Sequence, residues 1–264
     1  MTGPVAYRAS AVFDGTRMLP GHALVVEDGR VATIAGPGEV PADVRLVDLG
    51  DGILAPGFVD LQVNGGGGVM FNAAPSVDTL RVIAQAHAGL GATTILPTLI
   101  TDTPARTRAA IEAAIAATEQ GVAGIGGLHL EGPHLSLARK GAHDPALIRP
   151  MGPADLAALL EAARRLPVLK VTVAPENVSR DQVAALAGAG VLVSLGHTDA
   201  DFDTCMDYAA AGARCATHLF NAMSQMQNRA PGLVGAVLHN GALSSGLIAD
   251  GIHVHPAAMA AALR

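Results

Sequence analysis

Short apolar runs alternate with amphipathic segments along most of the chain, and from residue 53 this alternation becomes regular. Apolar runs of four to eight residues, bounded by glycine, proline or polar residues, are typical of buried strands. Strands are expected at residues 53–61, 92–98, 125–130, 168–174, 191–196, 213–218 and 244–249. Because helical segments separate these runs, the pattern predicts a parallel sheet of α/β type.

Helical periodicity fills the intervals between the runs. Apolar residues between 156 and 163 follow the spacing i, i+3, i+4, i+7, which places one stripe against a sheet. Thr103-Pro104 is a helix start with proline at the first helical position, and Ser179 to Gln182 is a capping box. Helices are expected over residues 76–90, 104–120, 156–163, 179–188, 199–211 and 233–240, and from Pro256 onward.

The first 51 residues follow a different pattern. Four short β-like runs, at 7–13, 22–27, 30–35 and 44–49, are separated by turn signals such as Asp14-Gly15 and Asp28-Gly29. We therefore expect two domains, a small antiparallel β unit over residues 1–51 and an α/β unit over residues 52–264.

Polar residues gather at the carboxyl ends of several predicted strands, which favours a barrel over a doubly wound sheet. A (β/α)8 barrel needs eight strands and the pattern provides seven. The sequence stops at Arg264, inside the seventh crossover, so we expect either that the eighth strand lies outside these residues or that something else closes the barrel.

Composition narrows the function classes. Aromatic residues make up 3% of the chain, tryptophan is absent and the net charge is −6, which argues against a nucleic-acid partner. Residues 1–13 lack the basic and apolar regions of a secretory leader, so we expect none there, and no apolar run reaches the roughly 18 residues of a membrane span. Cys205 and Cys215 are expected as buried free thiols. The sequence thus predicts a cytoplasmic protein without a membrane partner.

Three predicted strands end in side chains that bind metals. Glu131 follows the apolar run 125–130, and His197 and His218 end two later strands. A carboxylate and two imidazoles are the ligands that zinc-type divalent ions prefer. Three protein ligands leave one coordination position open, as hydrolytic metal sites require. These residues predict a metal-dependent hydrolase.

Six motifs, distributed in order over essentially the whole chain, are specific enough to indicate a family. They are Gly57-Phe58-Val59-Asp60-Leu61-Gln62-Val63-Asn64-Gly65, His129-Leu130-Glu131-Gly132-Pro133, Gly141-Ala142-His143, Gly196-His197-Thr198, Thr217-His218-Leu219-Phe220-Asn221-Ala222-Met223 and Asp250-Gly251-Ile252-His253-Val254. With these motifs the chain resembles the N-acetylglucosamine-6-phosphate deacetylases of the amidohydrolase superfamily.

The resemblance implies a TIM-like barrel beside a small β-sandwich, and hydrolysis of the sugar phosphate's acetamide to glucosamine 6-phosphate and acetate in amino-sugar catabolism. It implies that Glu131, His197 and His218 are the metal ligands and that His143 and His253 have catalytic roles. The substrate-binding residues that it implies are Gln62, His143, Asn221, Ala222, Arg229 and His253, with Arg229 as a phosphate contact. It also implies a homodimer or larger homo-oligomer.

Two departures from the superfamily pattern qualify these expectations. Gln62-Val63-Asn64 stands where many amidohydrolases carry His-x-His. Because a neutral amide is a poor ligand, we expect one divalent ion, Zn²⁺ in preference to Fe²⁺, Mn²⁺ or Co²⁺. The general base of the superfamily, an aspartate that ends the eighth strand, is expected beyond Arg264, because neither Asp60 nor Asp250 fits that role.

Two alternatives stay open at this point. One is another amidohydrolase, such as a dihydroorotase-like or deaminase-like enzyme, although Lys170 lies too early on its strand to bridge two metals. The other is a sugar-phosphate-binding homologue that has lost its base. A further strand that ends in aspartate would favour the enzyme.

Overall fold

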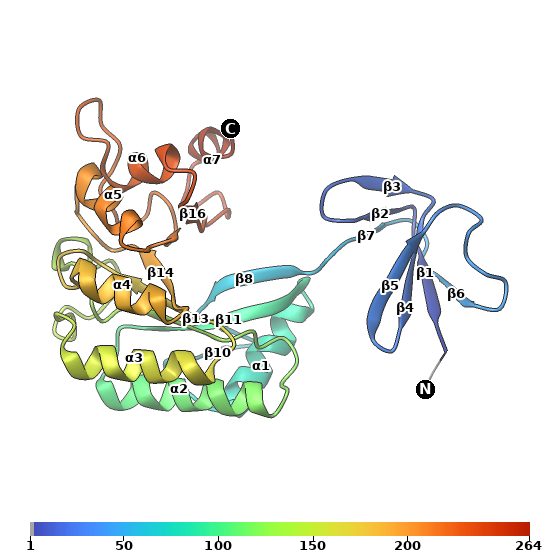
Figure 1. Cartoon of the computed structure of the whole chain (residues 1–264), viewed down its shortest axis with the longest axis horizontal. Helices are drawn as coiled ribbons and strands as arrows, with labels where there is room; N and C mark the ends of the chain where they lie inside the picture. The colour runs from blue at the N-terminus through green and yellow to red at the C-terminus, as the bar shows by residue number, and fades with distance from the viewer. Residues whose placement is uncertain (1–2) are drawn as a thin grey trace. The chain divides into compact units, whose positions relative to one another are not determined.

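A computed structural model describes residues 3–264 of the chain, shown in Figure 1. The chain divides into two compact units, and the division falls between Phe58 and Val59. In residues 3–264, none of the helices combines the length and the apolar character that a membrane span needs.

The smaller unit contains two β-sheets. Its strands are β1 (Val5–Arg8), β2 (Ala11–Phe13), β3 (Met18–Pro20), β4 (Ala23–Glu27), β5 (Arg30–Ala35), β6 (Arg45–Asp48) and β7 (Ile53–Leu54). Four strands form one sheet in the order β5-β4-β1-β6, and three form the other in the order β3-β2-β7. The packing of these two sheets as a β-sandwich stays a prediction.

The expectation of a purely antiparallel β unit is wrong. β6 runs parallel to β1, and β7 runs parallel to β2. The physical reason is the connection: β4 and β5 are joined by a tight turn that forces antiparallel pairing, whereas the longer segment 36–44 carries the chain back before β6 begins. Both sheets are therefore mixed.

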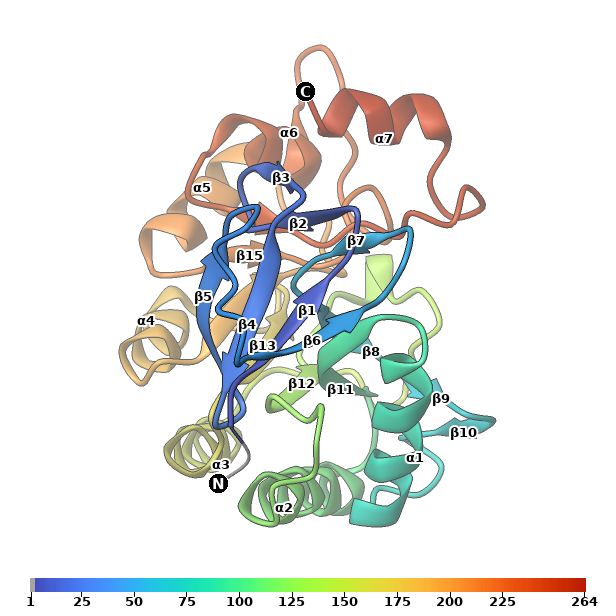
Figure 2. The same cartoon turned by 90° about the vertical axis from the view of Figure 1, so that its right-hand side faces the viewer.

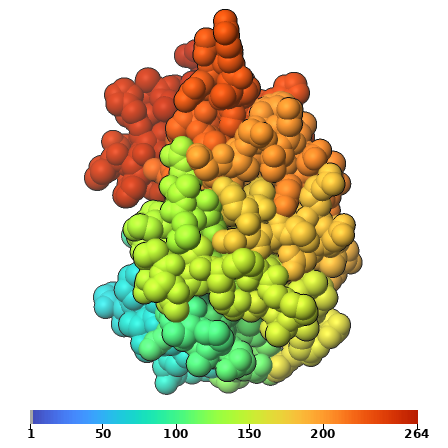
Figure 3. Space-filling view, turned by 90° about the vertical axis from the view of Figure 1, so that its left-hand side faces the viewer, coloured from blue at the N-terminus to red at the C-terminus, as the bar shows by residue number. Residues whose placement is uncertain are grey.

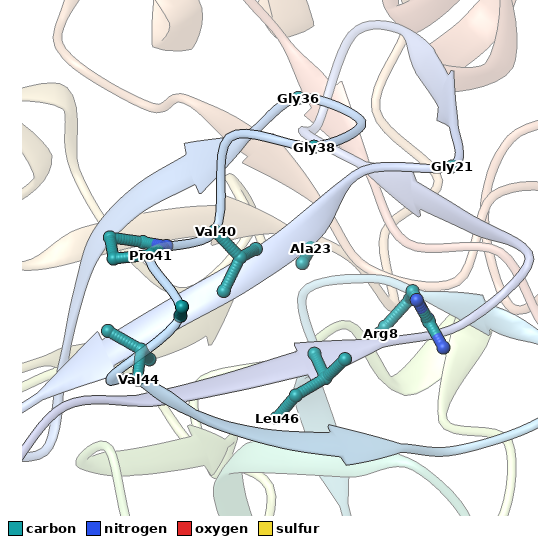
Figure 4. Close-up of a pocket in the computed structure, with 10 residues that line it drawn as sticks. Arg8, Gly21, Ala23, Gly36, Gly38, Val40, Pro41, Val44 and Leu46 are labelled. Atoms are coloured by element: carbon teal, nitrogen blue, oxygen red, sulfur yellow. The ribbon is translucent and has the colours of Figure 1, made fainter.

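A hollow of about 330 Å³ lies in the smaller unit. Figure 4 shows that Val40, Val44 and Leu46 line it together with Arg8. The lining includes no histidine, cysteine or carboxylate, and the guanidinium of Arg8 is already paired with Asp48 at 2.6 Å. Because it offers no catalytic group, this hollow is not the functional site.

The larger unit is built on a seven-stranded sheet whose order follows the chain, β8-β11-β12-β13-β14-β15-β16. These strands are β8 (Phe58–Val63), β11 (Ala92–Ile100), β12 (Leu128–Glu131), β13 (Leu169–Val173), β14 (Leu192–Leu195), β15 (Cys215–Ala216) and β16 (Ser244–Ser245). Neighbours from β11 to β16 pair in parallel. The prediction of seven strands in a parallel sheet is confirmed.

Helices connect successive strands. They are α1 (Val77–Ala88), α2 (Pro104–Glu119), α3 (Pro153–Arg165), α4 (Arg180–Gly188), α5 (Phe202–Ala210), α6 (Gly232–His239) and α7 (Pro256–Ala262). Figure 2 shows α1 to α5 in succession around the outside of the curled strands. A curled parallel sheet with helices on its outer side fits a TIM-like barrel. The eighth strand stays a prediction.

Two predicted helix starts are confirmed at the level of atoms. The hydroxyl of Thr103 accepts a hydrogen bond from the backbone N–H of Arg106 at 3.3 Å, and Pro104 opens α2. Ser179 and Gln182 form the predicted reciprocal capping box of α4. Each cap satisfies backbone N–H groups that have no partner inside the helix.

Three predicted strands need correction. The run 213–218 is a strand only over Cys215–Ala216. The run 53–61 is not one strand: Ile53–Leu54 forms β7 in the smaller unit, and the large sheet begins at β8. Pro56 lies between them and has no N–H to give to a sheet. The run 244–249 is a strand only over Ser244–Ser245. Within residues 3–264, β16 is an edge strand beside β15, so no second ladder holds residues 246–249 extended.

The alternation along β12 explains how a polar site forms inside an apolar unit. Leu128 and Leu130 belong to the hydrophobic core, and His129 and Glu131 alternate with them on the other face of the strand. All four residues are buried. Because the sheet is curled with its helices outside, polar side chains of neighbouring strands converge on the concave side.

Candidate metal centre

Three buried side chains meet at the carboxyl ends of β12, β14 and β15. The Nε2 atoms of His197 and His218 lie 3.1 and 3.0 Å from Oε1 of Glu131, and 3.0 Å from each other. Relative exposure is 3% for Glu131, 4% for His197 and 8% for His218. The structure therefore brings together the three residues that the sequence predicts as metal ligands.

The proton on His197 shows what this cluster can bind. Nδ1 of His197 lies 2.9 Å from the backbone carbonyl of Arg139, which can only accept a hydrogen bond. Nδ1 of a neutral His197 therefore carries the proton, and Nε2 presents a lone pair to Glu131 and His218. A lone pair directed at a carboxylate is repelled unless a cation lies between them. The donor set thus fits a divalent metal ion.

His218 supports the same conclusion. Its Nδ1 is buried and has no hydrogen-bond partner within residues 3–264. An unsatisfied buried polar atom costs about 1–3 kcal/mol, so the ring orientation must be stabilised by its other nitrogen. That nitrogen, Nε2, is the atom that faces Glu131 and His197.

The backbone at the site is strained. In the described part of the chain, five non-glycine residues have positive φ: Asp28, His197, His218, Phe220 and Ala222. Four of these five lie in the two segments that carry the imidazoles. Such conformations cost about 1–3 kcal/mol each and persist where the surrounding structure enforces them, which is common at functional sites.

The electrostatics of the cluster favour an ionised Glu131 and a neutral His143. The pKa of Glu131 lies well below its usual range although burial opposes ionisation, and this requires either protons on the facing Nε2 atoms of His197 and His218 or a cation between them and the carboxylate. The tautomer of His197 favours the cation. Burial, reinforced by the neighbouring His197, lowers the pKa of His143 to about 4. His143 is therefore neutral near pH 7.

His143 lies beside the three ligands. Its Nε2 is 3.8 Å from Oε2 of Glu131, and Glu131, His143 and His197 offer ligand atoms that all lie within 4.8 Å of one another. Two overlapping sets of three thus share Glu131 and His197. The set with His218 is the tighter one, with separations of 3.0–3.1 Å. Ligand atoms of a tetrahedral site with bonds of about 2.0–2.2 Å lie about 3.3–3.5 Å apart, so this tighter set fits a single ion better.

A buried hydrogen-bonded layer lies beneath the ligands. The imidazole of His129 contacts Oγ1 of Thr98 at 3.2 Å and Oγ1 of Thr172 at 2.7 Å. Oγ1 of Thr217 lies 2.7 Å from both Oγ1 of Thr172 and Oγ of Ser194. This layer joins five strands of the sheet. None of its members was predicted as a site residue, although His129 stands two residues before Glu131 and so shares its face of the strand.

The register also places Lys170 below the ligands. Lys170 pairs with His129, whereas Glu131 pairs with Thr172 one layer higher. Lys170 is 3% exposed, and burial lowers its pKa. In residues 3–264 no hydrogen bond or ion pair joins Lys170 to any of the three ligands, which gives no support to a lysine-bridged two-metal centre.

The segment after β12 covers the site. Besides the carbonyl of Arg139, it contributes the backbone N–H of Ser136, which donates to the carbonyl of His197 at 2.9 Å. The guanidinium of Arg139 pairs with Asp199 at 2.7 Å. Figure 3 shows this yellow-green segment against the orange part of the chain, which includes α5. Contacts between these two segments therefore hold the His197 ring.

Gly141 lies in this covering segment beside the ring of His197, and replacing it is expected to disturb the metal site. A Cβ at Gly141 would lie 3.1 Å from Cε1 of His197, and its φ of +55° is unfavourable for other residues. We expect Gly141→Ala to weaken metal affinity about 10-fold to 100-fold, as is typical when a contact that orients a ligand is lost. Chelator-competition titration measures this.

Gly188→Ala is the matched control, because a Cβ at this position in α4 would meet no atom within 4 Å. Equal metal affinities of the two variants would show that Gly141 does not position His197.

The remaining predicted site residues lie outside the buried cluster of Glu131, His197 and His218. Asn221 and Ala222 form the turn after His218, and Ala222 lies 3.8 Å from a Cβ built at Gly141. Gln62 is half-buried near the end of β8. Arg229 is exposed, and the His253 side chain is 59% exposed with its Nδ1 2.6 Å from Asp250. The structure does not bring Arg229 or His253 into the buried cluster, so their roles stay predictions.

The fold and the ligand geometry agree with the comparisons. The amidohydrolase family profile matches residues 53–264, which include the whole seven-stranded sheet and the three ligands. The chain therefore belongs to the amidohydrolase family.

Within this family the chain is similar to sugar-phosphate deacetylases. It is 43% identical over 244 residues to N-acetylgalactosamine-6-phosphate deacetylase from Shewanella sp. (strain ANA-3), and 34% identical over 239 residues to N-acetylglucosamine-6-phosphate deacetylase from Haemophilus influenzae. The alignments cover 92% and 90% of this chain. The chain spans 61% and 62% of the lengths of these two relatives.

A solved structure of a sugar-phosphate deacetylase is also similar to this chain. N-acetyl-D-glucosamine-6-phosphate deacetylase from Mycobacterium smegmatis, in complex with N-acetyl-D-glucosamine-6-phosphate, superposes with a TM-score of 0.91 at 34% sequence identity. The match covers 99% of this chain and 67% of that protein. The resemblance expected from the sequence motifs is confirmed.

Proposed function

We propose that this protein hydrolyses the acetamide of an N-acetylhexosamine 6-phosphate, N-acetylglucosamine 6-phosphate in the first place, to the free amino sugar phosphate and acetate. The observation that carries the proposal is the buried convergence of Glu131, His197 and His218 within 3.0–3.1 Å of one another. The reaction would serve amino-sugar catabolism or recycling.

Each residue of the cluster has a distinct part in the proposal. Glu131, His197 and His218 would hold one divalent ion, Zn²⁺ in the first place. When bound, such an ion supplies Lewis acidity to a carbonyl oxygen and to water. His143 would donate a hydrogen bond to the acyl carbonyl of the substrate. The general base would be an aspartate beyond Arg264, which would take a proton from the attacking water and pass it to the leaving amine.

The phosphate end of the substrate would be bound outside the buried cluster. Asn221 and Ala222 lie in the turn directly after His218, where backbone N–H groups suit an anion. Arg229 would add a forked donor, which matches phosphate oxygens well. Gln62 and His253 complete the proposed substrate contacts. A homodimer, the assembly that we propose, is tested by the mass of the native protein in solution.

A second candidate substrate is N-acetylgalactosamine 6-phosphate. It is favoured by the relative from Shewanella, whose identity to this chain is 43%. The two sugars differ only in configuration at C4, so the buried cluster would process the same acetamide in both.

Acetate release from both sugar phosphates tests the proposal. We expect the native protein, loaded with Zn²⁺, to release acetate from at least one of them, and to lose this activity on dialysis against a chelator and regain it when Zn²⁺ is restored. The unphosphorylated sugars are the controls and should be poor substrates. A zinc-loaded protein that binds but does not hydrolyse the sugar phosphates would favour the binding homologue instead.

A further inference from the structure

Thr101 forms two buried contacts with Nδ1 of His143, and these contacts determine which ring nitrogen of His143 carries the proton. Thr101 follows β11 directly and is 6% exposed. Its backbone N–H donates to Nδ1 of His143 at 3.3 Å, and its hydroxyl oxygen lies 2.7 Å from the same nitrogen. Both polar groups of one buried threonine are thus directed at one imidazole nitrogen.

The backbone N–H determines the direction of these hydrogen bonds. An amide N–H can only donate, so its partner Nδ1 must present a lone pair. If Nδ1 carried the proton, two N–H groups would face each other in a buried site, and the amide of Thr101 would lose its partner. A neutral imidazole has one proton, so that proton lies on Nε2.

His143 and His197 therefore have opposite tautomers. In His197 the carbonyl of Arg139 requires the proton on Nδ1 and leaves a lone pair on Nε2. In His143 the amide of Thr101 requires a lone pair on Nδ1 and leaves a proton on Nε2. Both Nε2 atoms face Glu131. A lone pair binds a metal ion, whereas an N–H group donates a hydrogen bond.

The position of Thr101 is itself determined by its neighbours. Its hydroxyl has one proton, which a lone pair on Nδ1 accepts at 2.7 Å, so the carbonyl of Glu131 at 3.5 Å is a packing neighbour only. A Cβ at Gly132 would approach that hydroxyl to 2.2 Å. On the other side, the Asn72 amide accepts from the N–H of Ile100 and donates to its carbonyl at 3.0 and 3.1 Å. The chain around Thr101 is thus held at both ends.

We propose that Thr101 is a positioning residue that holds His143 as the tautomer protonated on Nε2, so that His143 is a hydrogen-bond donor to the substrate carbonyl and not a metal ligand. This inference rests on the proposed function for the identity of the substrate. The tautomer itself does not depend on the substrate. A donor that is oriented in advance contributes most when the carbonyl oxygen gains negative charge, so its effect should fall on kcat more than on KM.

Spectroscopy tests the tautomer without any substrate. The native, zinc-loaded protein is labelled with ¹⁵N-histidine, and the His143 signals are assigned as those lost in His143→Gln. We expect one protonated nitrogen, at Nε2, and an unprotonated Nδ1. A proton on Nδ1 would overturn the inference.

Metal analysis separates the two overlapping ligand sets. His143→Gln should keep its zinc at the level of the unchanged protein, whereas His218→Gln should lose most of it. Zinc loss from His143→Gln equal to that from His218→Gln would make His143 a ligand and contradict the inference.

Kinetics test the contribution of the threonine hydroxyl. We expect Thr101→Val to lower kcat about 10-fold with KM changed by less than about 2-fold, and Thr101→Ser to restore kcat to within about 2-fold of the unchanged protein. Thr118→Val on α2 is the control, because its hydroxyl donates only to the carbonyl of Ile115. Thr101→Val keeps the backbone N–H, so an unchanged kcat in this variant would contradict the part of the positioning role that we assign to the hydroxyl, provided that the protein still unfolds at the temperature of Thr118→Val. If the unchanged protein released no acetate, the proposed function would fail, and the ¹⁵N spectrum would still decide the tautomer.

Discussion

Glu131→Gln is expected to lose bound metal and to lower kcat/KM for acetate release by about 10³-fold or more. Glutamine keeps the size of the side chain but removes the charge, and a neutral amide is a poor ligand for a zinc-type ion. The Lewis acidity of a bound ion contributes several kcal/mol to transition-state stabilisation, and each 1.36 kcal/mol is a factor of about ten in rate. Elemental analysis and acetate release measure the two effects separately.

Glu161→Gln is the matched control for this change. Glu161 lies on α3, where its exposed carboxylate pairs with Arg164 one turn away. The control should keep both metal and activity, because exposed ion pairs contribute at most about 1 kcal/mol to stability. If Glu131→Gln kept a full complement of metal, the ligands would have been assigned to the wrong residues.

Leu128→Ala is expected to lower the free energy of unfolding by about 2–5 kcal/mol, which is the usual cost of a large cavity in a protein core. Leu128 is 0% exposed and begins β12, three residues before Glu131. Its neighbour across the sheet is Leu169 on β13. Urea unfolding of the metal-free protein measures the change without a contribution from metal binding.

The control for this second prediction is Leu90→Ala, since Leu90 is 78% exposed. Its effect should stay within about 0.5 kcal/mol, as for most surface substitutions. If Leu128→Ala lowered the free energy of unfolding by less than about 1 kcal/mol, the side chains around β12 would have to repack into the cavity, which contradicts a rigid core there.

The elements of the larger unit were predictable because each depends on local signals. A buried parallel strand must be apolar throughout, and a helix that covers it must carry one apolar stripe, so both leave a period in the sequence. The length of β16 and the break at Pro56 depend instead on which strands pair with each other, and this is not encoded locally in the sequence. The parallel pairing of β6 with β1 has the same origin, since a strand run does not specify its partner.

The residues of the candidate site were predictable where they end a buried strand, but their backbone contacts were not. Glu131, His197 and His218 stand out because a charged or polar residue that ends a buried strand needs a partner. The tautomers of His143 and His197 depend on a backbone amide at Thr101 and a backbone carbonyl at Arg139, and every residue except proline has both groups. No side-chain pattern could reveal them. The hydroxyl layer around His129 was predictable only in part. The alternation of side chains along the strand places His129 on the same face as Glu131, but it does not identify Thr98 or Thr172 as its hydrogen-bond partners.

The ligands come from the third, fifth and sixth strands of a sheet whose spatial order follows the chain. During synthesis on the ribosome, an emerging chain can therefore pair each new strand with the one before it, but it has no complete ligand set until His218 has emerged. Metal uptake must then follow the assembly of the earlier strands instead of guiding it. We therefore expect the metal-free protein to be folded, and the proposed deacetylase activity to return on addition of the ion without a refolding step.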